Sequence, residues 1–336
     1  MARMNATRAP SAPIGISLGD PAGIGPEIVV KALTARPKLP VVVYGDPAIL
    51  AATSAALGLP PVPPDRVRAV VPGAQAESVE AIVAGRPNLA SAAAQLAALD
   101  AATAAALAGE IAALCTAPIS KDWIARVGFA FPGHTEYLAH RAGVDDFAMM
   151  LAGPRLRVVL ATTHVALRDV ATRLAPADIT RAAVLGARAL ARSFGIARPR
   201  VAVAGLNPHA GEAGRFGDEE TRVVAPAIAA ARARLADPEE GQQPCPAELS
   251  GPHPPDTVFR QAALGAYDAV VALYHDQGLI PVKYLGVEKG VNVTLGLPLV
   301  RTSPDHGTAF DIAGTGRADE SSLLEAIRVA RELTSP

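Results

Sequence analysis

Three histidines follow three apolar runs of the chain, each at the point where the run ends. They are His164, His209 and His275, which follow residues 156–161, 201–205 and 269–273. Because the carboxyl ends of parallel strands lie at one edge of a sheet, we expect the three imidazoles at the same rim. Neutral imidazole is the commonest ligand of Zn²⁺ and similar ions, and three imidazoles with an open fourth position form a catalytic site. Any one histidine could equally cap a strand, but their equivalent positions favour a metal site.

The residues beside these histidines and the remaining histidines are less informative. Asp276 either orients the imidazole of His275 or is a turn residue, and the sequence does not choose between the two. His140 lies in a predicted helix beside Arg141, and His253 lies in a proline-rich segment that we interpret as a loop. Both are expected on the surface.

Several segments carry residue types that bind anions. Residues 19–27, GDPAGIGPE, form a glycine turn between a strand and a helix, where free backbone N–H groups attract phosphate. His134 and Thr135 begin a helix after a Pro-Gly pair, and Thr135 could simply be its N-cap. Three donors lie in a segment otherwise poor in charge and could hold a phosphate or carboxylate, although solvated surface charge is the alternative. These donors are Lys283, Asn292 and Arg301.

The elements that must position these residues alternate along the chain. Strands are predicted at 14–18, 41–44, 111–115, 156–161, 201–205, 269–273 and 291–295. Helices are predicted at 26–33, 88–108, 176–194, 218–235, 257–264 and 321–333. This alternation predicts an α/β fold with a mainly parallel sheet covered on both faces. Residues 62–74 and 237–255 are interpreted as loops without a role in the core.

Length and composition limit the class of protein. The 336 residues suit two α/β domains, and half of them are hydrophobic. With 31 Lys and Arg against 32 Asp and Glu, the chain lacks the basic excess of a nucleic-acid-binding protein. Its two cysteines are unrelated in sequence, and neither a signal peptide nor a membrane span is expected, so a cytoplasmic location is predicted. Residues 1–12 are interpreted as a disordered tail.

Taken together, seven motifs resemble the 4-hydroxythreonine-4-phosphate dehydrogenase family of vitamin B6 synthesis. The resemblance covers the chain from about Ile14 to its end. The matching stretches are GDPAGIGPE at 19–27, TAPISK at 116–121, GHTEYLA at 133–139, ATTHVALRD at 161–169, GLNPHAGE at 205–212, YHDQG at 274–278 and VNVTLGLPLVRTSPDHGTAFDIAG at 291–314.

The resemblance implies specific roles for the residues singled out above. It implies a divalent metal, Zn, Co or Mg, on His164, His209 and His275. It also implies a homodimer in which residues of both subunits complete the active site. Asp276 and Lys283 are the candidate proton acceptors. The implied substrate contacts are His134, Thr135, Lys283, Asn292 and Arg301.

Residues 305–314 also resemble the adenosine-binding loop of isocitrate and isopropylmalate dehydrogenases. This likeness implies their fold, with two α/β/α domains and an active-site cleft between the domains. The first, cofactor-side domain is expected at 13–135 plus 286–336, and the second, with the metal site and the dimer contact, at 136–285. An acid that binds the ribose hydroxyls favours NAD over NADP. The implied cofactor residues are His306, Gly307, Thr308 and this acid, Asp311.

The function that the resemblance implies is NAD-dependent, metal-dependent oxidation of 4-phosphohydroxy-L-threonine at C3. Loss of CO₂ would then give 3-amino-2-oxopropyl phosphate. One alternative is a sister dehydrogenase acting on 4-phosphothreonate, 4-phosphoerythronate or an aromatic dihydrodiol carboxylate. Two others are a three-histidine metal hydrolase, which would have no use for the loop at 305–314, and a metabolite-binding protein, which would leave the histidines unexplained.

Overall fold

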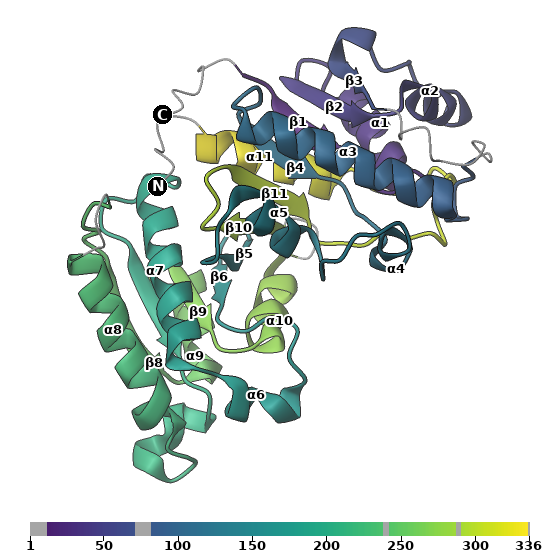
Figure 1. The fold of residues 1–336 in the computed structure, drawn as a ribbon. Helices are drawn as coiled ribbons and strands as arrows, with labels where there is room; N and C mark the ends of the chain where they lie inside the picture. The colour runs from purple at the N-terminus through teal and green to yellow at the C-terminus, as the bar shows by residue number, and fades with distance from the viewer. Residues whose placement is uncertain (1–11, 71–81, 238–241, 287–289, 335–336) are drawn as a thin grey trace. The chain divides into compact units, whose positions relative to one another are not determined.

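The computed structural model describes residues 12–70, 82–237, 242–286 and 290–334, so most of the predicted tail lies outside the described residues. The chain divides into two compact units. Unit 1 contains Met1–Val144 and Leu297–Pro336, and unit 2 contains Asp145–Gly296. Each unit is an α/β structure with a mainly parallel sheet, which confirms the predicted fold class (Figure 1).

Both unit boundaries fall later in the chain than the sequence led us to expect. Helix α5 (His134–Ala142) belongs to unit 1 because its Tyr137 and Leu138 are buried in that unit's core. Strand β10 (Val291–Leu295) belongs to unit 2 because it pairs with β5 (Ala148–Ala152). The expected boundaries at 135 and 285 would cut each element from its partners.

The sheet of unit 1 is entirely parallel, in the order β3-β2-β1-β4-β11. Strands β1, β2 and β4 are buried along their whole length, as expected for a sheet covered on both faces. The strands are β1 (Ile14–Ser17), β2 (Val41–Gly45), β3 (Val67–Ala69), β4 (Ala113–Thr116) and β11 (Val300–Pro304).

Helix α3 (Leu89–Leu107) covers one face of this sheet. Its alanines favour the helix, and Asn88 and Ser91 cap its start with reciprocal hydrogen bonds. It is the one helix of the described residues long and apolar enough to cross a membrane, with half of the relevant window buried. Its Leu99 and Ala102 lie in the core of unit 1, so α3 is a core helix. The other helices of unit 1 are α1 (Gly25–Ala35), α2 (Pro47–Ala56), α4 (Lys121–Ala125), α5 and α11 (Ser321–Thr334).

The sheet of unit 2 has the order β10-β5-β6-β9-β7-β8. Its first two pairings are antiparallel, and the remaining three are parallel. The three strands that precede the predicted metal ligands are β6, β9 and β7, which are neighbours in the sheet. Besides β5 and β10, the strands are β6 (Arg157–Leu160), β7 (Arg200–Ala204), β8 (Glu248–His253) and β9 (Ala269–Ala272).

Helices cover both faces of the unit 2 sheet. On one face α7 and α8 pack side by side (Figure 1). On the other, α9 and α10 bury Phe259 and Leu279 against the strands. The helices are α6 (Leu167–Arg173), α7 (Pro176–Arg192), α8 (Ala225–Ala236), α9 (Pro255–Ala263) and α10 (His275–Gly286), and two irregular turns lie at Pro208–Gly214 and Glu220–Val224.

Two segments interpreted as loops contain strands. Strand β8 lies inside the proposed loop 237–255, and β3 lies inside 62–74, of which residues 71–74 are outside the described residues. Both are edge strands, so they lack the long apolar runs that identify central strands. Sequence patterns also missed β5 and β11.

A buried polar network fixes the turn at residues 19–25 against α3. Asp20 is fully buried and accepts hydrogen bonds from Ala22 N and from Gln95 Nε2 of α3, at 2.9 and 3.0 Å. The Gln95 Oε1 accepts from Ser120 N at 2.9 Å. Gly19 has φ +73°, and a Cβ there would lie 2.3 Å from Pro118 O, so only glycine fits. One side chain of α3 therefore joins two of the seven motifs.

Replacing Gln95 by Leu should lower the free energy of unfolding by about 3 kcal/mol, because a buried carboxyl oxygen and the Ser120 N–H each lose their partner. Urea unfolding measures this change. A loss below about 1 kcal/mol would contradict the network's structural role.

Candidate functional site

A buried cation lies at the centre of the predicted substrate residues of unit 1. Arg301, on β11, is 3% exposed, and its Nη2 donates to Thr116 Oγ1 at 2.6 Å. Burial lowers the pKa of the guanidinium to about 10, against the opposing effects of Cys115 and Glu136. Arg301 therefore stays charged at neutral pH. A buried cation of this kind requires an anion or strong acceptors nearby.

His134 lies beside this cation at the start of α5. Its pKa is well below 6.5, first because of burial and then because of the positive charges of Arg301 and Lys121. Its Nε2 is buried and has no hydrogen-bond partner among the described residues. Thr135, the next residue, is also buried. A neutral imidazole with an unused ring nitrogen suits a site that receives a polar ligand.

The surroundings of His134 favour an anionic ligand. A Cβ on Gly133 would lie 3.7 Å from Lys121 Nζ, so the lysine reaches the start of α5. Two cations and the N-terminus of a nine-residue helix together attract phosphate or carboxylate. Glu136 offsets part of this charge, since its Oε2 lies 3.4 Å from the same point.

The structure brings together three of the predicted substrate residues, His134, Thr135 and Arg301, in unit 1. It adds Thr116 and Lys121, which the sequence reasoning missed. Both belong to TAPISK, a polar segment directly after a predicted strand, and that position was the available signal. The other two predicted residues belong to unit 2. Lys283 is exposed on α10, and Asn292 lies on β10 with its Oδ1 buried.

Two of the three predicted metal ligands are adjacent. The ring centroids of His164 and His275 lie 5.8 Å apart, at an angle of 37°. The Asp276 Oδ1 is 2.7 Å from the Nδ1 of His275, which leaves Nε2 as the free ligand nitrogen. Strands β6 and β9 place the two imidazoles because they pair in parallel and their ends are joined by a hydrogen bond from Thr162 Oγ1 to Leu273 O at 2.7 Å.

His209 is not grouped with this pair. No cluster of three or more His, Cys, Asp or Glu side chains in metal-binding geometry occurs among the described residues. The His209 side chain is 62% exposed, and its Nδ1 lies 3.9 Å from Asp256 Oδ2. It opens a run of five residues, 209–213, that all have positive φ. Such backbone costs about 1–2 kcal/mol for each non-glycine residue and is concentrated at functional sites.

Glu220 anchors the start of this left-handed run. Its Oε1 accepts from the backbone N–H groups of Leu206 and Asn207, both at 2.8 Å, and its Oε2 accepts from Asn207 Nδ2 at 2.9 Å. Burial by itself would raise the pKa of the carboxyl, but these hydrogen bonds outweigh it and the pKa is lowered. Gln277 adds a bond from its Nε2 to Gly205 O at 2.7 Å. The ends of β7 and β9 are thereby fixed to one another.

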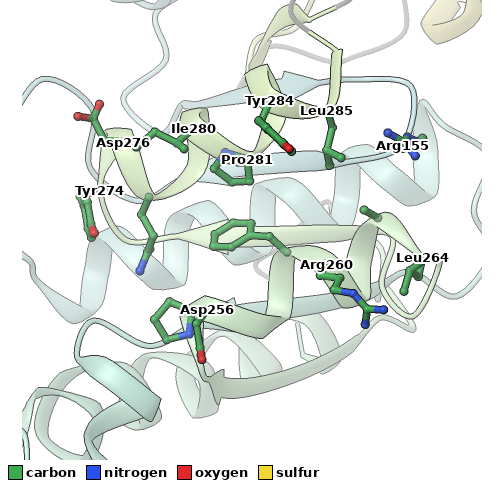
Figure 2. Close-up of a pocket in the computed structure, with 14 residues that line it drawn as sticks. Arg155, Asp256, Arg260, Leu264, Tyr274, Asp276, Ile280, Pro281, Tyr284 and Leu285 are labelled. Atoms are coloured by element: carbon green, nitrogen blue, oxygen red, sulfur yellow. The ribbon is translucent and has the colours of Figure 1, made fainter.

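A pocket of about 690 Å³ lies between α9 and α10 (Figure 2). Asp256, Tyr274 and Asp276 lie toward one end of it, whereas Arg155 and Leu264 lie toward the other (Figure 2). The two acids are the neighbours of His209 and His275, respectively. The pocket therefore adjoins both histidines, and its volume is within the range of small-molecule sites.

The predicted cofactor residues lie on one loop after β11. His306 and Thr308 are partly buried, whereas Gly307 and Asp311 are exposed. The loop turns sharply at Ala309, whose φ is +42°. Thr308 O accepts a hydrogen bond from Ile24 N at 2.9 Å, so the loop contacts the glycine turn of 19–27.

The two other histidines differ from one another. His140 is exposed on α5, as predicted. His253 is not in a surface loop but ends strand β8, where its Nε2 lies 2.8 Å from Ser250 Oγ and burial lowers its pKa. The prolines around His253 led us to predict a loop. The prediction was wrong because β8 is an edge strand, and edge strands tolerate proline.

Comparison with known proteins identifies close relatives. The family model described as "Pyridoxal phosphate biosynthetic protein PdxA" matches residues 37–330. The chain is 48% identical over 329 residues to 4-hydroxythreonine-4-phosphate dehydrogenase of Desulfosudis oleivorans, covering 94% of each chain. It is also 48% identical, over 335 residues and 96% of each chain, to the protein of the same name from Beijerinckia indica.

Two solved structures are similar to this chain over nearly its whole length. The crystal structure of 4-hydroxythreonine-4-phosphate dehydrogenase from Klebsiella pneumoniae has a TM-score of 0.83 and 41% identity, over 96% of this chain and 99% of that one. A terephthalate 1,2-cis-dihydrodioldehydrogenase from Burkholderia xenovorans has a TM-score of 0.65 and 33% identity, over 96% and 98%.

The lowered pKa of His134 predicts a pH-dependent stability. Below pH 6.5 the unfolded chain protonates this histidine while the folded chain does not, so stability present at neutral pH is lost as the pH falls. The variant His134→Gln should lose less stability than the wild type between about pH 7.5 and 5.5. The difference should grow by up to about 1.4 kcal/mol for each pH unit below about pH 6.5. Urea unfolding at the two pH values measures the difference, with His140→Gln on the same helix as control. Parallel losses in the wild type and His134→Gln would contradict the assignment.

Proposed function

Because the chain belongs to the pyridoxal phosphate biosynthetic protein PdxA family, we propose that it oxidises 4-phosphohydroxy-L-threonine at C3 with NAD. The oxidised product is a 3-keto acid, which loses CO₂ to give 3-amino-2-oxopropyl phosphate. A dehydrogenase requires a hydride acceptor, and the enzymes of this family are dehydrogenases. The observation that carries the choice of substrate is the buried cationic site around Arg301, which suits a phosphorylated acid.

The anion-binding role belongs to unit 1. Arg301 and Lys121 supply the charge, and neutral His134 and Thr135 supply directional hydrogen bonds at the start of α5. Holding a charged end of the substrate there fixes its orientation and lowers the entropic cost of reaching the transition state. Lys283 and Asn292 are proposed as further substrate contacts.

The metal-binding role belongs to unit 2. The adjacent imidazoles of His164 and His275 fit a divalent ion such as Zn²⁺, Co²⁺ or Mg²⁺, and we propose His209 as the third ligand. When bound, such an ion lowers the pKa of a substrate hydroxyl and stabilises negative charge on oxygen. The bond between Asp276 and His275 Nδ1 supports an orienting role for Asp276. Because Asp276 takes this orienting role, we assign the role of proton acceptor to the other candidate, Lys283.

The cofactor role belongs to the loop after β11. Asp311 is exposed on its turn and is suited to accept hydrogen bonds from ribose hydroxyls. Its charge would repel a 2′-phosphate, which supports NAD over NADP. His306, Gly307 and Thr308 are proposed as neighbouring cofactor contacts.

A homodimer is proposed from the surface of α10. Ile280 is 66% exposed and Tyr284 89% exposed, on the helix that begins with His275. Large apolar side chains at such exposure are typical of a contact surface when they cluster. In a single chain His209 is not grouped with His164 and His275. We propose that a partner subunit on this face completes the metal site.

A second candidate reaction is oxidation of an aromatic dihydrodiol carboxylate, which the similarity to the Burkholderia xenovorans enzyme favours. Both reactions would use the same metal and hydride chemistry. They differ in the charge presented to Arg301 and Lys121, because a phosphate carries up to two negative charges and a carboxylate one.

The turnover of purified protein distinguishes these reactions. With NAD, a divalent ion and 4-phosphohydroxy-L-threonine, we expect NADH formation that a chelator abolishes and added Zn²⁺ or Co²⁺ restores. Absorbance of NADH measures the rate, and 4-phosphothreonate, 4-phosphoerythronate and a dihydrodiol carboxylate are the comparison substrates. A rate confined to one of the comparison substrates would contradict the proposed substrate. NADH formation unaffected by chelator would contradict the metal.

A further inference from the structure

A partly buried ion pair contacts the end of the proposed cofactor loop. Glu27, the last residue of GDPAGIGPE, is 2% exposed, and its Oε1 lies 3.0 Å from the Nζ of Lys31, one turn later on α1. Neither residue belongs to the metal, substrate or cofactor contacts proposed above. Ionised side chains buried without a structural or functional use are rare, so the pair needs an explanation.

Both side chains bind the backbone of the loop and not its side chains. The two carboxyl oxygens of Glu27 accept from Gly314 N at 3.1 Å and from Ala318 N at 2.9 Å. The Lys31 ammonium donates to Gly316 O and Ala318 O, both at 2.6 Å. With the bond to Glu27, all three donors of the ammonium are used. The end of the loop is therefore held by four charge-assisted hydrogen bonds, which are stronger than neutral ones.

The other end of the loop is held by the same segment of chain. Ile24 N donates to Thr308 O at 2.9 Å, and a Cβ on Gly23 would lie 2.9 Å from that oxygen. Glycine at position 23 thus permits the close approach. Between these two anchors, residues 309–313 form a turn that carries exposed Asp311. The segment from 23 to 31 fixes both ends of the turn and leaves its outer edge open.

A pocket of about 360 Å³ adjoins the anchor. Its lining includes Pro21, Gly23 and Glu27 from the glycine turn and Gly314 from the loop. The two segments thus form one surface whose shape depends on how they are held together.

We propose that Glu27 and Lys31 are positioning residues for the cofactor, joining the glycine turn and the loop 305–318 into one cradle for the adenosine end of a nicotinamide dinucleotide. This inference rests on the proposed cofactor role of the loop. The pair contacts only the backbone of the loop, so it acts through the loop's conformation. The expected consequence of breaking the pair is weaker dinucleotide binding with little change in the binding of the phosphorylated substrate.

The test compares Lys31→Met and the double variant Glu27→Gln/Lys31→Met with the wild type and with Lys38→Met. Lys38 is an exposed lysine just beyond α1 with no side-chain hydrogen bond among the described residues, so it is a matched control. The double variant guards against misfolding, because Lys31→Met alone leaves the buried carboxylate of Glu27 unpaired. Calorimetric titration of each folded protein with NAD gives the dissociation constant, and circular dichroism checks the fold.

We expect the dissociation constant for NAD to rise at least about tenfold in both variants and by less than twofold in Lys38→Met, in line with the loss of groups that orient a binding loop. The KM for NAD should rise while the KM for the phosphorylated substrate stays within about twofold, a split that general destabilisation would not give. Hydrogen exchange at Gly314 and Ala318 should accelerate in both variants. Unchanged NAD affinity despite accelerated exchange would overturn the inference. Failure of the wild type to bind NAD would instead refute the proposed cofactor.

Discussion

The parallel pairing of buried strands is the constraint on which the rest of this molecule depends. Parallel strands must be covered on both faces, so their middles are mostly apolar, and most polar residues lie at the strand ends or in the segments that follow them. Arg301, which is buried within β11, is an exception. In unit 1 the ends of β4 and β11 contribute Thr116 and the loop that we propose as the cofactor site. In unit 2 the ends of β6 and β9 contribute the adjacent imidazoles of His164 and His275. One physical requirement thus places the chemistry in each unit.

Polar groups buried at these strand ends are stabilised by hydrogen bonds to the backbone. Asp20, Glu27 and Glu220 are each at most 5% exposed. Asp20 accepts a hydrogen bond from a backbone N–H of its own turn, whereas Glu27 and Glu220 accept from backbone N–H groups of other segments. A buried carboxylate without such partners would be strongly destabilising, whereas one with several partners fixes the segment that supplies them. The three carboxyl groups therefore hold, in turn, the glycine turn, the proposed cofactor loop and the loop that carries His209.

Sequence patterns predicted the parts of this arrangement that depend on local periodicity. Most central strands and the long helices α3, α7 and α11 were identified from their apolar runs, but the central strand β5 was missed. Edge strands β3 and β8 were not, because one neighbour is missing and fewer of their residues are buried. The positions of His164 and His275 after strands predicted their proximity, but not the partners of Glu27 and Glu220. Those partners lie on loops brought together only by the tertiary structure. The roles of Thr116 and Lys121 were missed because neither lies at an exceptional spacing.

The central claim is that residues after neighbouring strands of unit 2 bind a divalent ion for the dehydrogenase reaction. Anomalous scattering at the cobalt edge, from crystals grown with Co²⁺, tests it most directly. The account predicts one strong peak within bonding distance of an imidazole nitrogen of both His164 and His275, with a nitrogen of His209 from the same or a second chain as a third ligand. Absence of a peak at these imidazoles in crystals that contain bound cobalt elsewhere would contradict it.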